Sequence, residues 1–105
     1  MKGYVYDEET FVGEISLENG HYIFQYDSTF LENSQNFAIS LTLPKRQEPY
    51  ISENLHPFFS NILAEGNLKK LQCKQLKIDE EDEFTRLLKT AHSDTIGAIT
   101  VREER

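Results

Sequence analysis

The chain has 105 residues, of which 38% are hydrophobic and 28% charged, so we expect one folded domain over residues 1–105 rather than a disordered chain. Its 18 Asp and Glu residues against 11 Lys and Arg residues give a formal net charge of −7, which argues against direct binding to nucleic acid or anionic lipid. No apolar run approaches the roughly 20 residues that span a bilayer, no signal-peptide core is present, and a single cysteine excludes an internal disulfide, so a cytoplasmic protein is predicted.

The first half of the chain has the alternation of apolar residues that is typical of strands. Residues 4–6 predict a short strand, followed by a turn at residues 7–9. The strongest local signal is a β-hairpin over residues 11–26, in which both arms alternate and Asn19-Gly20 forms the turn. This dipeptide readily adopts the positive φ angles of a type I′ turn.

A further alternating segment follows the hairpin. Residues 37–43 carry an apolar side chain at every second position up to Pro44, which predicts another strand that ends at the proline. Residues 45–53 are mostly polar and are expected to form a loop.

The spacing of apolar residues changes to that of helices near residue 55. A stripe at helical spacing predicts a first helix that ends at Gly66, a residue that tolerates left-handed backbone. A second helix is expected over residues 67–77, and a third is expected to be capped by Asp79, with the acidic residues 80–83 in its first turn. The stripe of the first helix is Leu55, Phe58, Phe59, Ile62 and Leu63, and that of the third is Phe84, Leu87, Leu88 and Ala91.

The chain returns to a strand pattern at residues 96–101. Strands, then helices, then a strand predict an α+β domain. We expect a small antiparallel sheet, built on the hairpin and further short strands, with about three helices between residues 54 and 91.

Residues that often carry chemistry lack the required spacing here. His21, His56 and His92 are too far apart in sequence to resemble a zinc motif. The acidic run 79–83 lacks the alternating ligands and the glycine of an EF-hand loop, and Cys73 has no neighbouring His or Cys. The chain has no phosphate-binding loop. We therefore predict no catalytic residue, no cofactor and no metal.

A binding module is the remaining interpretation. Phe58 and Phe59 are adjacent, so on a helix they point about 100° apart, and one can enter the core while the other faces outward. The alternative from another class is a small acid–base hydrolase that uses two carboxylates, such as Glu65 and Asp94. That alternative predicts a deep pocket with carboxylates of perturbed pKa.

The segment PFFSNILAEG, residues 57–66, resembles the PFF-x-NLLPEG segment of the HipA N-terminal domain family. Ala64 replaces the usual proline, and His92-Ser93 replaces the usual Gly-Gly. The kinase core that follows this domain in the family is expected to be absent. Other features of the family occur in the same order over residues 11–101: Gly13, Phe24-Gln25-Tyr26, Ser40-Leu41-Thr42-Leu43-Pro44, Asp82-x-Phe84 and Asp94-x-x-Gly97-Ala98.

The resemblance implies a free-standing antitoxin similar to the HipS proteins of split HipBST toxin–antitoxin systems. The implied partner is a HipT- or HipA-like serine/threonine kinase, with a HipB-like helix-turn-helix protein that supplies the DNA contact in a ternary complex. An interaction module of the same ancestry with a different partner is the alternative, and inhibition of the kinase, its stabilisation and the oligomeric state all stay open. Partner-binding residues are expected on the first predicted helix and the loop after it: Phe59, Leu63, Glu65 and Gly66.

Overall fold

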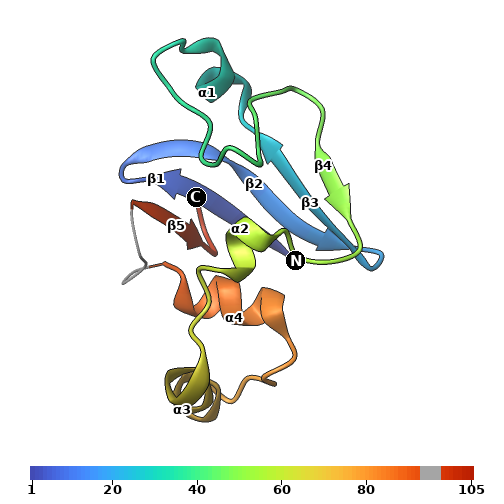
Figure 1. Ribbon diagram of the computed structural model, residues 1–105, viewed down its shortest axis with the longest axis vertical. Coiled ribbons are helices and arrows are strands. Elements are labelled where there is room, and N and C mark those ends of the chain that lie inside the picture. Colours follow the sequence, from blue (N-terminus) through green and yellow to red (C-terminus); the bar gives the residue numbers. More distant parts are fainter. Residues whose placement is uncertain (93–97) are drawn as a thin grey trace.

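Five antiparallel strands form one sheet in the computed structural model, which describes residues 1–92 and 98–105. The strand order is β4-β3-β2-β1-β5 (Figure 1). The arrangement confirms the predicted α+β class and adds a helix, α1, that the sequence pattern does not reveal. The strands are β1 (Lys2–Asp7), β2 (Thr10–Glu18), β3 (His21–Tyr26), β4 (Tyr50–Ser52) and β5 (Ile99–Arg102). The helices are α1 (Ser28–Glu32), α2 (Pro57–Ser60), α3 (Gly66–Leu76) and α4 (Glu83–Thr90).

The β2–β3 hairpin forms where the sequence predicts it. Asn19 and Gly20 have φ angles of 51° and 78°, as a type I′ turn requires. Ile15 pairs with Phe24 across the hairpin, and both side chains are buried. Because side chains alternate between the two faces of a strand, this register assigns one face of the hairpin to the core.

The prediction of a strand over residues 37–43 is wrong. This segment is an irregular connection between α1 and β4 that includes an isolated bridge from Ser40 to Leu43. The neighbour of β3 is β4, which lies within residues 45–53, where the sequence predicts a loop. The alternation at 37–43 does not mark a strand, because only Ile39 and Leu43 of its apolar side chains contact the core, whereas Phe37 and Leu41 are exposed.

The chain returns to the sheet at its C-terminal end, as predicted. β5 pairs with β1, with Val5 opposite Val101, and both side chains are fully buried. The described part of this strand begins at Ile99, and the start of the predicted range 96–101 lies outside the described residues.

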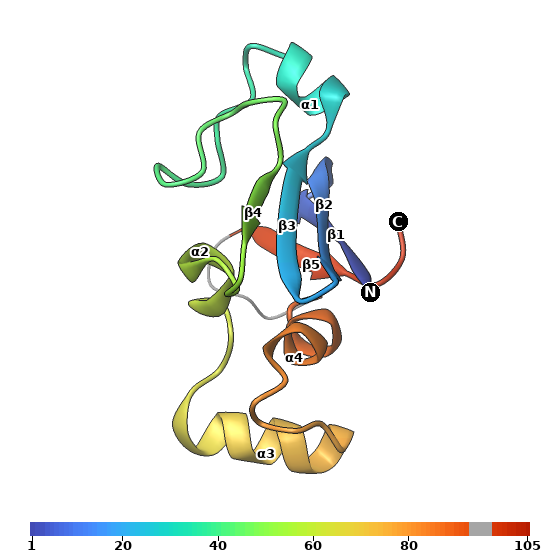
Figure 2. The ribbon, with the colours of Figure 1, turned by 90° about the vertical axis from the view of Figure 1, so that its right-hand side faces the viewer.

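Only part of the helix predicted over residues 55–65 is α-helical. After α2 the backbone tightens into two i→i+3 hydrogen bonds, donated by Ile62 at 3.1 Å and Leu63 at 3.2 Å. Gly66 has the expected positive φ, 61°, but it begins α3 instead of ending the preceding helix. The tighter turns keep Leu63 in the core while the chain leaves the sheet toward α3 (Figure 2).

The next two helices are confirmed, with one change of cap. α3 matches the helix expected over residues 67–77. The N-cap of α4 is Asp82 and not Asp79, because the Asp82 carboxylate accepts hydrogen bonds from the Thr85 N–H at 3.1 Å and the Thr85 hydroxyl at 2.7 Å. Asp79 instead accepts from the backbone N–H of Glu81 at 2.9 Å, in the turn before the helix. The predicted apolar stripe of α4 is buried: Phe84, Leu87, Leu88 and Ala91.

Substitution Asp82→Ala is expected to lower the free energy of unfolding by about 1 kcal/mol, the usual contribution of an N-cap. Asp79→Ala is the matched control, since it removes an exposed carboxylate three residues earlier, and it should change stability by less than about 0.5 kcal/mol. Urea denaturation of both variants measures the difference. A larger effect of Asp79→Ala would show that the helix is capped at the earlier position.

Two of the helices cover one face of the sheet. α2 and α4 lie on this side, and α3 lies farther out and contacts α4 (Figure 2). On the other face, Tyr4, Tyr6 and Phe11 form a ring cluster, over which the guanidinium groups of Arg102 and Arg105 each lie 3.9 Å from a ring centroid. Within the described residues, each helix is too short or too polar to span a membrane. The largest fully buried side chains are Phe59, Phe84, Ile15, Leu43 and Leu87.

Candidate partner-binding surface

The structure divides the four predicted partner-binding residues into two groups. Phe59 is 0% exposed and Leu63 is 7% exposed, so both belong to the core and are unavailable to a partner in this conformation. Glu65 and Gly66 are exposed. Phe58, the neighbour of Phe59, is half-buried, so one ring of the pair enters the core and the other reaches the surface. Binding at the two exposed residues stays a prediction.

A polar hollow of about 310 Å³ lies beside Glu65 and Gly66. Arg86 of α4 lines it, is only 5% exposed, and donates a hydrogen bond to the carbonyl oxygen of Ala64 at 2.8 Å. This bond ties the loop between α2 and α3 to α4, and it thereby fixes the position of the exposed residues at the rim. The other side chains of the hollow come from Ser60, Asn61, Leu63, Lys69 and Glu83.

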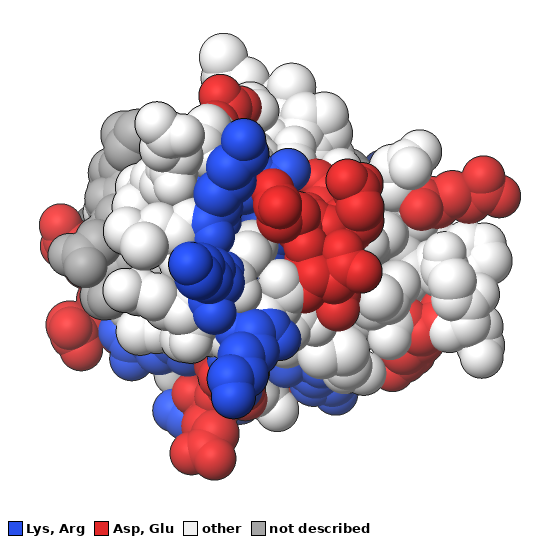
Figure 3. All heavy atoms as spheres, turned by 90° about the horizontal axis from the view of Figure 1, so that it is seen from below, with Lys and Arg blue, Asp and Glu red and all other residues white. Residues whose placement is uncertain are grey.

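The end of the molecule that carries α3 has charges of both signs. Seen from below, a band of basic side chains runs beside an acidic cluster (Figure 3). α3 carries Lys69, Lys70 and Lys74, and the acidic run 79–83 lies between this helix and the body of α4. The formal charge of −7 is therefore unevenly distributed, and a partner at this end would meet both signs.

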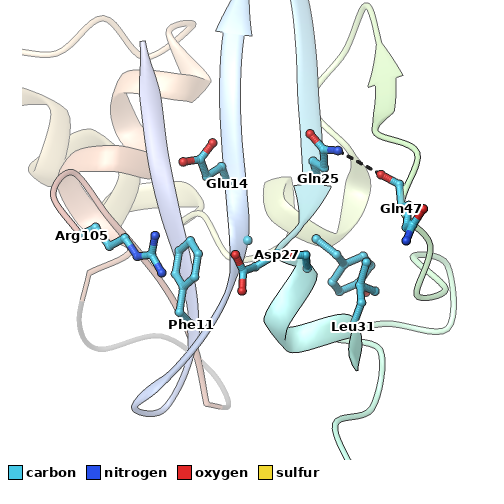
Figure 4. Close-up of a pocket in the computed structure, with 10 residues that line it drawn as sticks. Phe11, Glu14, Gln25, Asp27, Leu31, Gln47 and Arg105 are labelled. Atoms are coloured by element: carbon cyan, nitrogen blue, oxygen red, sulfur yellow. Dashed lines mark hydrogen bonds between the residues drawn. The ribbon is translucent and has the colours of Figure 1, made fainter. Parts of the chain in front are cut away.

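A larger hollow, of about 440 Å³, lies on the opposite face of the sheet (Figure 4). Its carboxylates belong to Glu14 and Asp27. Asp27 caps α1 by accepting two backbone hydrogen bonds at 3.1 and 3.3 Å, and Glu14 lies 3.5 Å from the ammonium of Lys2. Because each carboxylate has a structural partner, this hollow provides no acid–base pair in support of a hydrolase. Asp94, from the predicted pair with Glu65, lies outside the described residues.

The histidines and the cysteine are dispersed over the fold. The Nδ1 atom of His56 accepts a backbone hydrogen bond at 3.0 Å and caps α2, whereas the ring of His21 bonds the carbonyl of Asn19. His92 is exposed, and Cys73 is buried in α3. In the part of the chain that the structure describes, no group of three His, Cys, Asp or Glu side chains could hold a metal ion.

Besides Met1 and Ile51, large exposed apolar side chains among the described residues occur in two groups. In the connection between α1 and β4, Phe37 is 84% exposed and Leu41 is 100% exposed. On α3, Leu68, Leu71 and Leu76 are about half exposed. The exposure of the first pair has no signal in the sequence, because the alternation at these positions predicts burial in a strand.

The comparisons with known proteins agree with this architecture. The HipA N-terminal domain family model matches residues 4–102. An uncharacterized protein of Haemophilus influenzae is 31% identical over 104 residues, which are 99% of this chain and 92% of that protein. A solved structure, the "N-terminal domain of HipA toxin", matches with a TM-score of 0.69 and 28% identity, over 99% of this chain and 94% of that chain.

Two relatives from Sinorhizobium fredii are much longer. "Putative kinase Y4mE" is 28% identical over 94 residues, and "Putative kinase Y4dM" is 31% identical over 93 residues. The alignments cover 89% and 82% of this chain but only 22% of each of these relatives. This chain thus spans about a fifth of those proteins and nearly all of the Haemophilus protein. The sequence match and the shared fold show that the chain belongs to the HipA N-terminal domain family.

Proposed function

We propose that this chain is a non-catalytic antitoxin of the bacterial cytoplasm, which binds a separately encoded HipA-like serine/threonine kinase and restrains it. One observation carries the proposal. The matching region is 92% of the Haemophilus protein but 22% of each Sinorhizobium protein named as a kinase. The same domain therefore occurs both as almost a whole chain and as part of a longer one. In the longer proteins this domain would contact the kinase through one of its surfaces. A separate chain that keeps this surface could bind a kinase that lacks the domain.

A separate chain must dock without the help of a covalent link. A short linker provides an effective concentration in the millimolar range, which a separate chain replaces with contact area of its own. An interface of standard size buries about 800 Å² on each partner, and the whole surface of this chain is 6901 Å². The interface would thus take more than a tenth of the surface, an area much larger than that of one loop.

We place part of this interface at Glu65 and Gly66, the exposed members of the predicted set. The hydrogen bond from Arg86 to the carbonyl of Ala64 holds their loop in one position, which lowers the entropic cost of binding. Phe59 and Leu63 support this surface from the core.

The net charge indicates what kind of partner would approach. A formal charge of −7 speeds encounter with a basic protein surface and opposes contact with DNA phosphates. DNA binding in this proposal therefore belongs to a HipB-like helix-turn-helix protein in a ternary complex.

Co-purification from the native cytosol tests the partner. We expect tagged chain to recover a short HipA-like kinase, identified by mass spectrometry, and an equimolar amount of the chain to suppress substrate phosphorylation by that kinase. The variant Glu65→Lys should weaken binding, whereas the matched control Glu104→Lys, which reverses an exposed charge after β5, should not.

Three outcomes would contradict parts of the proposal. If no kinase is recovered from an extract in which it is detected, the partner is wrong and a module with a different partner becomes the better interpretation. Binding without loss of phosphorylation would make the chain a stabilising subunit and not an antitoxin. Equal effects of the two charge reversals would show that overall charge, and not the loop, determines binding.

A further inference from the structure

The connection between α1 and β4 presents two large apolar side chains that the fold does not use. Phe37 is 84% exposed and Leu41 is fully exposed, whereas Leu43 is buried and Ile39 packs against the core. Single exposed apolar residues are common on protein surfaces, so exposure alone does not mark a site. The rigidity of the connection and the distribution of charge distinguish this pair.

Hydrogen bonds hold the connection in one shape. The hydroxyl of Tyr26 accepts from the Ile39 N–H at 3.2 Å and donates to the carbonyl of Leu43. Between these points the Leu43 N–H donates to the carbonyl of Ser40 at 3.1 Å and closes a tight turn with Leu41 at its corner. Burial raises the pKa of Tyr26, so its hydroxyl remains protonated and able to donate at neutral pH.

Side-chain hydrogen bonds also hold the two ends of this connection in place. The ammonium of Lys45 donates to the carbonyl oxygens of Asn33 at 3.2 Å and Asn36 at 2.9 Å. The hydroxyl of Tyr50 in β4 donates to the carbonyl of Pro44 at 2.5 Å. Because the backbone is already ordered, little conformational entropy is lost when a partner covers this segment.

Charge is depleted on the same side of the molecule. Residues 33–44 and 54–64 contain no Asp, Glu, Lys or Arg, and they are the two longest uncharged runs of the sequence. The α1–β4 connection projects from the side of the sheet that carries α2, which lies within the second run (Figure 2). Depletion of charge distinguishes the centre of a protein–protein interface from the remaining surface.

We propose that Phe37 and Leu41 are apolar anchors that insert into recesses of the kinase, at the centre of an interface formed by residues 33–44 and 54–64. This inference rests on the proposed function. Glu65 directly follows the second run and lies at the polar rim of the same interface. A second copy of the chain is the weaker candidate, because it would add another formal charge of −7 and like charges oppose association.

Binding of the kinase recovered by co-purification, purified alone, tests the anchors. The double variant Phe37→Ser/Leu41→Ser should raise the Kd about a hundredfold, because a few buried anchors dominate the energy of an interface. The matched control is Ile51→Thr, which removes another exposed apolar side chain. Ile51 lies on the opposite face of the sheet, since the adjacent Tyr50 packs against the core. Circular dichroism and urea denaturation should match wild type for both variants.

Each of the other outcomes leads to a different conclusion. An unchanged Kd for the double variant, with a kinase that binds wild type, would overturn the anchors and leave the proposed function in place. Failure of wild type to bind any HipA-like kinase would overturn both. An equal loss in Ile51→Thr would also reject the proposed interface. A wild-type dimer in light scattering that the double variant abolishes would assign the anchors to a second copy instead.

Discussion

The substitution Phe59→Ala lowers the free energy of unfolding by about 3–5 kcal/mol in our expectation, the usual cost of removing a fully buried aromatic side chain. Phe59 is 0% exposed, and its ring centroid lies 5.4 Å from that of Phe24 in the sheet. Alanine would leave a cavity between α2 and β3, and packing around the site can close it only in part. Urea denaturation followed by circular dichroism measures the loss.

Phe58→Ala is the matched control, because it makes the same chemical change at the adjacent position. Phe58 is half-buried and meets Phe59 edge to face at 5.2 Å, so we expect a loss of only about 1 kcal/mol. If the two variants are equally stable, the assignment of Phe59 to the core is wrong.

This prediction determines which variants can report on a partner. Loss of kinase binding by Phe59→Ala would not identify a contact residue, because that variant removes a large part of the stability of a domain this small. Substitutions at exposed positions, such as Glu65, Phe37 and Leu41, avoid this ambiguity.

The second large effect is expected at Gly13, in the middle of the sheet. A Cβ atom added there would lie 2.2 Å from the carbonyl oxygen of Gln25 in β3, which is far inside van der Waals contact. Since the obstacle is backbone, Gly13→Ala must push β2 and β3 apart and disturb the pairing with Tyr26. We expect a loss of about 3 kcal/mol, at the upper end of the cost of overpacking.

Glu14→Ala provides the control for Gly13→Ala. The adjacent side chain is partly exposed and makes one ion pair, with Lys2 at 3.5 Å, so its loss should cost less than about 1 kcal/mol. Thermal unfolding of the two variants side by side separates the clash from a general sensitivity of β2. A Gly13→Ala protein as stable as the control would show that the strands can separate without cost at this point.

Elements with a strong local signal were predictable from the sequence. Asn19-Gly20 determines the hairpin, because few other residue pairs tolerate two positive φ angles in succession. The apolar stripe of α4 is likewise local, since its residues recur at helical spacing, and all four are buried. The sequence predicts Asp79 as the N-cap of α4, whereas the structure has Asp82 there. Several acidic residues in one run could each cap the helix, so the pattern does not distinguish them.

Strand pairing was less predictable, because it depends on which segments meet in space. β3 pairs with Tyr50–Ser52 and not with residues 37–43, although the latter have the stronger alternation. The buried hydroxyl of Tyr26 and the turn at Ser40 satisfy backbone groups of residues 37–43 locally, so that segment can remain outside the sheet.

The candidate surface was only half predictable for a related reason. A helical stripe identifies the side chains that face the core, and it therefore selected Phe59 and Leu63, which are buried. The loop after them, with Glu65 and Gly66, is exposed, and its role in binding stays a prediction. The exposure of Phe37 and Leu41 could not be predicted, because a strand would place both on the same face as Leu43, whereas the irregular backbone turns them outward.

By itself the sequence determined the α+β class, the central hairpin, the two longer helices and the resemblance to the HipA N-terminal domain family, because these follow from short-range spacing and from motifs. The tertiary structure alone decided that β4 pairs with β3, that Phe59 belongs to the core and that the α1–β4 connection carries exposed apolar side chains. These three features depend on contacts between segments far apart in the chain. Several segments compete for the same sheet edge and the same core volume. A local sequence pattern does not show which of them occupies it.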